Sequence, residues 1–433
     1  MTDKFHLGWF LNFVADEWKG TWGDGGKDFT GDFYVEVAKS LERAKFDYIL
    51  IEDKLMVSTA YGGTMEYDLK HGVNPKHDPV PLAVLMAAAT TRIGVVPTMS
   101  TSFYPPFLLA RLCSTVDHIA RGRFGWNVVT SAEDRSAQNF GLDRLYEHDE
   151  RYARASEYLD LVSRLWESWD PDAVERDHLT GTYANHKKVH TVDFEGKYYR
   201  CRGPLNTAPS PQYRPTIAQA GASPPGRALA ARYADTIVSP ANTVEAMKEY
   251  RDDIHARMRA IGRDPSECKV LYLASPVVAD THDEAVAKRE RWFNDPENIE
   301  YMLAELSSIT EIDFAAFDLD QPLPEDLTTN GERGTLAAFM AGGEDKTLRE
   351  LVTGSGLFSH TPFVGTPAEV AEEMGEVMAA VGGDGFLLTT PVMRLNRRYV
   401  AEITEGLVPQ LQRRGLTRTE YTTTMLRDHL REF

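Results

Sequence analysis

Residues 215–240 read "PTIAQAGASPPGRALAARYADTIVSP". The apolar run at 215–221 predicts a buried strand, and it ends on the small residues Gly221, Ala222 and Ser223. A helix is predicted over 223–233, because Ser223 can cap it and a proline suits its first turn. The apolar run at 235–240 then predicts a second strand. A strand, a helix and a strand in succession indicate one unit of a parallel sheet.

The same alternation continues along the whole chain. Further strands are predicted at 5–11, 47–52, 92–98, 123–130, 269–278 and 384–390. Helices are expected at 31–45, 80–90, 106–120, 149–168, 223–233, 243–260, 282–306 and 397–413. Eight strands, each followed by a helix, predict an α/β fold consisting of a single (β/α)8 TIM barrel, whereas an open doubly wound sheet usually has fewer strands. A G-x-G-x-x-G dinucleotide motif does not follow any of these strands.

Three connections are too long for simple turns, and long loops in compact domains tend to be functional. We expect one barrel domain over 1–415 with insertions at about 53–79, 170–214 and 307–365. The second insertion contains a predicted hairpin in "KVHTVDFEGKYYRC" (188–201). Residues 416–433 form a polar C-terminal tail, a candidate arm for contact with another subunit.

Composition narrows the classes of function. The 433 residues carry 47 basic and 65 acidic side chains, a formal charge of -18, which disfavours nucleic acid and anionic membranes as partners. The three cysteines are widely spaced and odd in number, which favours a reducing compartment over a disulfide framework. The N-terminus lacks the pattern of a secretory signal, and we did not find an apolar stretch long enough to span a membrane. We therefore expect a cytoplasmic protein.

Polar residues stand where the predicted strands end, which is where barrel enzymes build their active sites. Asp53 follows the second strand, Thr98 ends the third, and Asn127 lies in the fourth. His148 and Tyr152 lie one turn apart at the start of the helix near 149. Each has a structural alternative: a turn cap for Asp53, a satisfied barrel position for Thr98 and Asn127, and core packing for Tyr152.

The strand end at Gly221 to Ser223 has the features of an anion site. A helix N-terminus presents unpaired N–H groups and the positive end of the helix dipole. Gly221 would let a ligand approach the backbone, Ser223 can contribute its hydroxyl, and Arg227 can add positive charge. The alternative is an ordinary capped helix.

The motifs of several common kinds of catalytic site are not found in the sequence. We find neither an H-E-x-x-H metal motif nor a G-x-S-x-G nucleophile elbow, and "HKKVH" (186–190) lies in a polar loop. We therefore expect no metal site. Without an evident metal or nucleophile, an organic cofactor is the expected source of reactivity.

Three motifs in order, "GRFGWNVVTS" (122–131), "HDERYARASEYLDLVSRLWESW" (148–169) and "IAQAGASPPGRALAARYAD" (217–235), resemble the bacterial-luciferase-like flavin monooxygenases. The branch that they resemble contains nitrilotriacetate, EDTA, dibenzothiophene-sulfone and long-chain-alkane monooxygenases, and the resemblance runs from about residue 5 to 415. It implies a barrel that holds reduced FMN, takes it from a separate NAD(P)H-dependent flavin reductase, and uses molecular oxygen. It also implies a homodimer or homotetramer.

Carried over position by position, the resemblance places FMN contacts on Asp53, Thr98, Asn127, His148, Tyr152, Gly221, Ala222 and Ser223. The phosphate would meet Tyr152 and Ser223, and the ring system would lie against the second to fourth strands. The segments 53–79 and 307–365 are candidate lids that exclude water. Candidates for the substrate wall are Phe10, Trp18, Trp22, Met56, Phe103 and Tyr104, and candidates for catalysis are His6, Asn12 and Tyr61.

The substrate implied is a small organic molecule, and the aromatic loops favour an aromatic or heterocyclic one that is oxygenated, cleaved or dehalogenated. His6 has an alternative role as a satisfied core histidine. Two rival functions remain at this point. One is a deazaflavin-dependent oxidoreductase of the same superfamily, and the other is a flavin-binding protein without catalytic activity.

Overall fold

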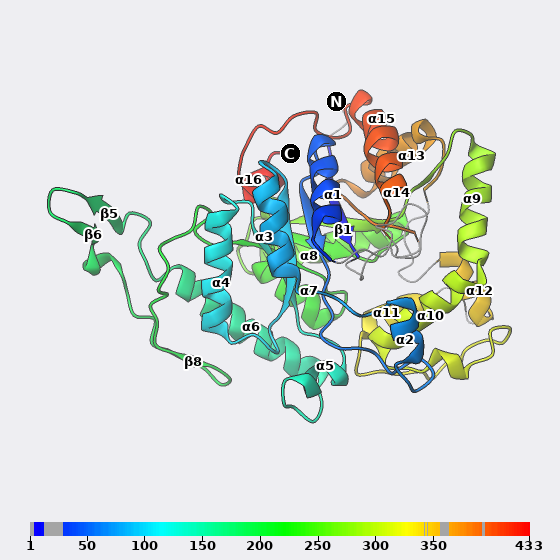
Figure 1. Ribbon diagram of the computed structural model, residues 1–433, viewed down its shortest axis with the longest axis horizontal. Coiled ribbons are helices and arrows are strands. Elements are labelled where there is room, and N and C mark those ends of the chain that lie inside the picture. The colour runs from blue at the N-terminus through cyan, green and yellow to red at the C-terminus, as the bar shows by residue number, and fades with distance from the viewer. Residues whose placement is uncertain (1–3, 13–28, 342, 344, 356–362, 392–394) are drawn as a thin grey trace.

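The computed structural model describes residues 4–12, 29–341, 343, 345–355, 363–391 and 395–433, and eight of its strands form a closed parallel barrel (Figure 1). The order around the barrel is β1, β2, β3, β4, β9, β10, β11 and β14. This confirms the predicted fold class and the position of all eight predicted strands. Their bounds are His6–Leu11 (β1), Tyr48–Ile51 (β2), Gly94–Ser100 (β3), Gly125–Val129 (β4), Thr216–Gln219 (β9), Thr236–Ser239 (β10), Lys269–Ala274 (β11) and Gly385–Leu388 (β14).

The strands are apolar on both faces because a parallel barrel buries both. In β2, Tyr48 and Leu50 belong to the apolar cluster of the barrel interior, whereas Ile49 and Ile51 belong to the cluster shared with the surrounding helices. This alternation follows from the two-residue period of a strand. Interior residues from the other strands include Val96, Ala218, Val238, Leu271, Leu273 and Leu387.

Most of the surrounding helices match the predicted ranges: α1 (Asp32–Arg43), α3 (Pro79–Ala89), α4 (Pro106–Ile119), α6 (His148–Trp166), α7 (Pro224–Tyr233) and α8 (Val244–Ala260). The predicted helix at 397–413 is α14 (Arg397–Ala401), a wider π-helical turn (Glu402–Leu407) and α15 (Val408–Arg413). The π-helical turn ends two residues before Pro409, which has no N–H to donate within a regular helix.

The prediction for 282–306 was wrong in two respects. The segment is two helices, α9 (His282–Asn294) and α10 (Pro296–Thr310), because Asp295 caps a new helix that begins at Pro296. Neither is the barrel helix before β14. That helix is α13 (Pro367–Val381), which packs between α8 and α15 and which the sequence analysis missed.

The three insertions carry secondary structure of their own. The first contains α2 (Glu66–His71). The second contains the predicted hairpin, β7 (Phe194–Glu195) with β8 (Arg200–Cys201), and a further hairpin of β5 (Val174–Asp177) and β6 (Thr182–Ala184). The third contains α11 (Arg333–Met340) and α12 (Leu348–Ser355), which share a separate apolar cluster with α9, α10 and Val73 of the first insertion. The first and third insertions therefore pack together.

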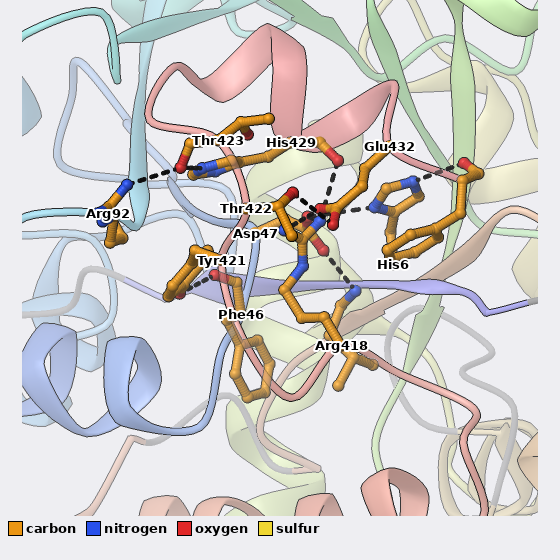
Figure 2. A network of polar contacts seen from close by, with 12 residues as sticks. His6, Phe46, Asp47, Arg92, Arg418, Tyr421, Thr422, Thr423, His429 and Glu432 are labelled. Atoms are coloured by element: carbon orange, nitrogen blue, oxygen red, sulfur yellow. Dashed lines mark hydrogen bonds and ion pairs between the residues drawn. The ribbon is translucent and has the colours of Figure 1, made fainter.

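The C-terminal segment folds back onto its own barrel. Leu426 and Leu430 of α16 (Leu426–Leu430) join the interior cluster. A Cβ atom on Gly94, at the start of β3, would lie 2.6 Å from Leu426 Cδ1, so this end of the barrel is tightly packed. Figure 2 shows the polar network beside it, in which Arg418 and His6 both contact the buried carboxylate of Asp47.

Among the helices of the described ranges, none combines the length and apolar character needed to cross a membrane.

Candidate functional site

A cavity of about 280 Å³ opens where the barrel strands end. Residues from the ends of β1 to β4, β9, β10 and β11 line it, together with the start of α6, the start of α7 and parts of the first and third insertions. The structure brings together all eight predicted cofactor contacts and one predicted wall residue: Phe10, Asp53, Thr98, Asn127, His148, Tyr152, Gly221, Ala222 and Ser223.

The start of α7 differs from the predicted anion site in one respect. Pro224 and Pro225 occupy the first two helical positions and carry no N–H, and the Gly226 N–H donates to Ser223 Oγ at 3.3 Å. The donors available to a ligand here are therefore hydroxyl groups more than first-turn amides. Tyr152 makes a side-chain hydrogen bond with Ser223, and burial raises the pKa of the Tyr152 phenol, so it stays protonated.

Two glycines make this turn possible. A Cβ atom on Gly226 would lie 3.0 Å from both Gly221 Cα and the Tyr152 hydroxyl. The Gly221 carbonyl is fixed from the other side by the Tyr250 hydroxyl at 2.7 Å. The end of β9 and the start of α7 can approach each other only because both positions lack a side chain.

Thr98 and Asn127 are paired across β3 and β4, and their side chains interact. The Thr98 hydroxyl donates to the Ile51 carbonyl at 2.7 Å, and Asn127 Nδ2 donates to Thr98 Oγ1 at 2.8 Å. Within the described residues, Asn127 Oδ1 and Gln219 Oε1 are buried acceptors without a hydrogen-bond partner. Unsatisfied buried acceptors are energetically costly, so a ligand with N–H or O–H donors fits this part of the cavity.

The end of β2 contributes charged groups. Burial, with a further contribution from the nearby charge of Asp78, raises the pKa of Asp53 to about 7. Its neighbour Lys54 makes a buried ion pair with Glu305 of α10 and donates to Ser308 Oγ at 3.2 Å. This pair connects the first insertion to α10, which leads into the third insertion, at the rim of the cavity.

The predicted pair at the start of α6 also faces the cavity. The rings of His148 and Tyr152 lie 5.0 Å apart, and His148 Nδ1 is 2.8 Å from the carboxylate of the exposed Asp149. His148 therefore lines the cavity while its Nδ1 contacts Asp149 at the surface.

Sequence reasoning missed the residues that the insertions bring to the cavity. Arg151 lies beside Tyr152 in α6, Glu305 and Ile309 lie in α10, and from the third insertion come Gly331, Glu332, Arg333, Gly334 and Thr335. The proximity of 331–335 to the cavity depends on how an insertion folds, which strand and helix periodicity does not encode. The only local signal was the pair of glycines in "NGERGT" (330–335).

Several predicted positions lie elsewhere. His6 is at the N-terminal end of β1, the opposite end of the barrel, where its Nδ1 lies 3.1 Å from Asp47 Oδ1 and its Nε2 lies 3.2 Å from the Phe433 carbonyl oxygen. It is a core histidine, and its position excludes contact with a ligand in the cavity. Arg227 does not add charge to the cavity either, because its guanidinium contacts Glu249 and Asp253.

The remaining predicted wall and catalytic residues do not line the cavity within the described ranges. Asn12 and Met56 are buried, Tyr61 packs on the insertion cluster, and its hydroxyl lies 3.5 Å from Glu300. Phe103 stacks on Phe140 with ring centroids 4.4 Å apart, and the Tyr104 ring packs against the main core. Trp18 and Trp22 lie outside the described residues.

Comparison with known proteins gives consistent relatives over nearly the whole chain. The family described as luciferase-like monooxygenase matches residues 5–385. Nitrilotriacetate monooxygenase component A of Aminobacter aminovorans is 37% identical, covering 92% of this chain and 89% of the relative. Dibenzothiophene-sulfone monooxygenase of Rhodococcus erythropolis is also 37% identical, covering 95% and 92%. A crystal structure of riboflavin lyase with modified FMN and riboflavin superposes with a TM-score of 0.89 at 31% identity, covering 100% and 96%.

Proposed function

Because the chain belongs to the luciferase-like monooxygenase family, we propose that it is the oxygenase component of a two-component system that uses reduced FMN and molecular oxygen to oxygenate a small organic substrate. The observation that supports this most directly is the meeting of eight predicted flavin contacts in one cavity. The family relationship already establishes the class of enzyme. We propose in addition that the flavin is bound in its reduced state and that the substrate is a small organic molecule.

The residues of the cavity fit FMN in their chemistry. The hydroxyls of Tyr152 and Ser223, with the open backbone at Gly221, suit the phosphate. The unpartnered acceptors Asn127 Oδ1 and Gln219 Oε1 suit the N–H and O–H donors of the flavin ring and its ribityl chain. The riboflavin lyase that resembles this chain was crystallised with modified FMN, which supports the same cofactor.

When bound, reduced flavin supplies the electrons that activate oxygen. The role of the protein would be to bind the flavin, to orient it and to keep water out of the cavity. Phe10, Val238 and Leu273 belong to or pack against the barrel interior cluster and form an apolar floor. The insertions close the sides through Lys54 and Glu305. The carboxyl of Asp53, with its pKa near 7, can hold or release a proton at Oδ close to neutral pH.

A separate NAD(P)H:flavin reductase is the proposed partner. The relative from Aminobacter aminovorans is named a component A, which implies a second component. The proposed enzyme would take its reduced flavin from such a reductase. The proposed substrate is aromatic or heterocyclic, supported by the apolar floor and by the likeness to the enzyme named for dibenzothiophene sulfone.

The proposal is tested by reconstitution. The purified chain is combined with FMN, NADH, a generic flavin reductase and a panel of sulfones, alkanes, haloaromatics and flavins under ¹⁸O₂. Mass spectrometry should detect a product that carries one labelled oxygen atom, and the product should disappear when the reductase is left out.

Two results would favour the rival functions instead. Tight binding of oxidised FMN without a labelled product from any panel member would favour a flavin-binding protein without catalytic activity. Binding of a deazaflavin, with an absorption maximum shifted to shorter wavelength than that of FMN, and no binding of FMN, would favour a deazaflavin-dependent oxidoreductase.

We also infer self-association, as a homodimer or homotetramer. The hairpin of β5 and β6 projects far from the body of the molecule (Figure 1). It carries Leu179, whose side chain is 98% exposed, and Tyr183, which is 57% exposed. Exposed apolar side chains on a projecting element support contact with a second copy. Sedimentation velocity should give more than one chain per particle.

A further inference from the structure

The N-terminal ends of two helices meet at the cavity. One is α7, which begins after Ser223, and the other is α11 of the third insertion, which begins at Arg333. A Cβ atom on Gly334 would lie 3.3 Å from the Ala222 side chain, so the two helix starts are in contact. Residues on both sides of this contact, Ala222, Ser223, Arg333 and Gly334, line the cavity. The insertion therefore completes the end of the cavity that holds Ser223.

Arg333 brings a positive charge to this end of the cavity. Its Nε donates to the Thr329 carbonyl at 3.0 Å, and within the described residues no carboxylate lies within ion-pair distance of its guanidinium. The side chain is exposed at the surface of the cavity. A guanidinium held through Nε alone keeps its two terminal nitrogens available for an anion.

A second arginine lies close by, and it is buried. Arg151 is only 3% exposed, and its terminal nitrogens donate to the carbonyls of Tyr146 at 2.8 Å and Asn330 at 3.1 Å. Its Nε is a buried donor without a partner within the described residues. Burial and, to a smaller extent, the nearby charge of Arg333 lower the pKa of Arg151. Glu133 and Glu147 raise the pKa of Arg151 by a smaller amount. Two neighbouring cations at one end of the cavity favour an anionic ligand.

The carboxylates near Arg333 are engaged elsewhere. Glu332 Oε2 accepts a hydrogen bond from the Thr335 hydroxyl at 2.7 Å. Asp149 is exposed and lies 2.8 Å from His148 Nδ1. Neither lies within ion-pair distance of Arg333, although the charge of Arg333 contributes, after the hydrogen bond with His148, to lowering the pKa of Asp149. The terminal nitrogens of Arg333 therefore remain accessible to an anion.

We propose that Arg333 binds the phosphate of FMN from the insertion side, opposite Tyr152 and Ser223, so that the third insertion is part of the cofactor site. This inference rests on the proposed function, because it assumes FMN in the cavity. It goes further in assigning an insertion residue to recognition of the phosphate. The insertion would then be held closed by the cofactor as well as by the Lys54–Glu305 pair.

The test compares two flavins that differ in the phosphate alone. FMN and riboflavin, both reduced and kept anaerobic, are titrated into the full-length protein, and binding is followed by quenching of tryptophan fluorescence. The wild-type chain should prefer FMN to riboflavin. Arg333→Gln should weaken FMN binding by about tenfold and leave riboflavin binding within about twofold, because one charge-assisted contact is lost. Arg333→Lys should retain part of the preference.

Arg349→Gln is the matched control. Arg349 lies in α12 of the same insertion, is exposed, and pairs with Asp320 at 2.8 Å, away from the cavity. This variant should bind both flavins as the wild type does. If Arg333→Gln keeps the wild-type ratio of FMN to riboflavin affinity, or loses both affinities equally, Arg333 does not bind the phosphate. If the wild type itself shows no preference for FMN, the phosphate site of the proposed function fails as well.

Discussion

Asp53 is a cavity residue whose charge changes in the neutral range, since burial raises its pKa to about 7. The protonated form is favoured because the charged form loses hydration in the cavity. As pH rises through 7, deprotonation places a negative charge in a cavity proposed to hold an anionic cofactor. The same deprotonation lowers the free energy of unfolding, because the stability that goes with a raised carboxyl pKa is lost above that pKa.

We therefore expect the affinity for FMN to fall between pH 6 and pH 8. Asp53→Asn should flatten this dependence, since the amide stays neutral. Equilibrium titrations at several pH values measure how the FMN affinity changes with pH. Asp143→Asn, at an exposed residue, is the control and should show the same pH dependence as the wild type. An identical slope in wild type and Asp53→Asn would show that another group is responsible.

Ser223 gives a prediction about charge at the start of α7. Ser223→Asp keeps a good helix cap but puts an anion beside the proposed phosphate. FMN binding should weaken by more than tenfold, because one repulsion in a partly buried site supplies ~1.4 kcal/mol or more. Thr243→Asp, at the corresponding capping position of α8, should leave FMN binding unchanged. Fluorescence titration measures the FMN affinity of both variants. Equal affinities would show that Ser223 does not contact the phosphate.

At the scale of elements, α10 and the third insertion are joined to the first insertion and to α6 by a few buried polar contacts. Lys54 pairs with Glu305 of α10, and Arg151 of α6 donates to the carbonyl of Asn330. The insertion also has its own apolar cluster, with Phe314 and Phe339 at its centre. It can therefore stay folded while its connection to the barrel weakens.

Lys54→Met should test that connection. Removing the lysine leaves Glu305 buried without a counter-charge, which typically costs ~3 kcal/mol or more. Thermal unfolding should shift to lower temperature, and Lys54→Met/Glu305→Leu should recover most of the loss. Lys248→Met, which removes an exposed pair with Asp252, should change little. Equal melting temperatures for Lys54→Met and the wild type would show that the pair does not stabilise the fold.

At the scale of the whole molecule, the cavity lies at one end of the barrel and α16 closes the other end. Leu426 and Leu430 join the same interior cluster against which Phe10 of the cavity wall packs. The tail and the ligand site are thus two ends of one apolar core. At the α16 end, Arg418 forms a buried ion pair with Asp47, and His6 contacts the same carboxylate (Figure 2).

Leu426→Ala should destabilise the whole chain by ~2–5 kcal/mol, as for other large-to-small changes in a packed core. Urea unfolding measures the loss, and FMN binding under native conditions should weaken only slightly, because the cavity is at the other end. Leu69→Ala, at a leucine of α2 that is 55% exposed, is the control and should lower stability much less. An unchanged urea midpoint for Leu426→Ala would show that α16 is not part of the core.

The barrel and much of the cavity could be predicted because both follow from local periodicity. Once the strands are placed, the direction of a parallel strand puts Asp53, Asn127 and Ser223 at one end. The same rule should have excluded His6, which begins its strand. Arg333 could not be found this way, because it depends on how α11 docks. The helix at 367–381 was missed because the segment 282–306 was predicted to be the barrel helix that precedes β14.

The closure of the barrel by α16 also has a consequence for biosynthesis. Strands β1 to β4 leave the ribosome long before Leu426, which packs against Gly94 and Gly125 at the starts of β3 and β4. A nascent chain that has made all of its early strands still exposes the apolar interior of the barrel to water or to a chaperone. We expect stable folding only after translation has passed this segment, however complete the ligand-binding end already is.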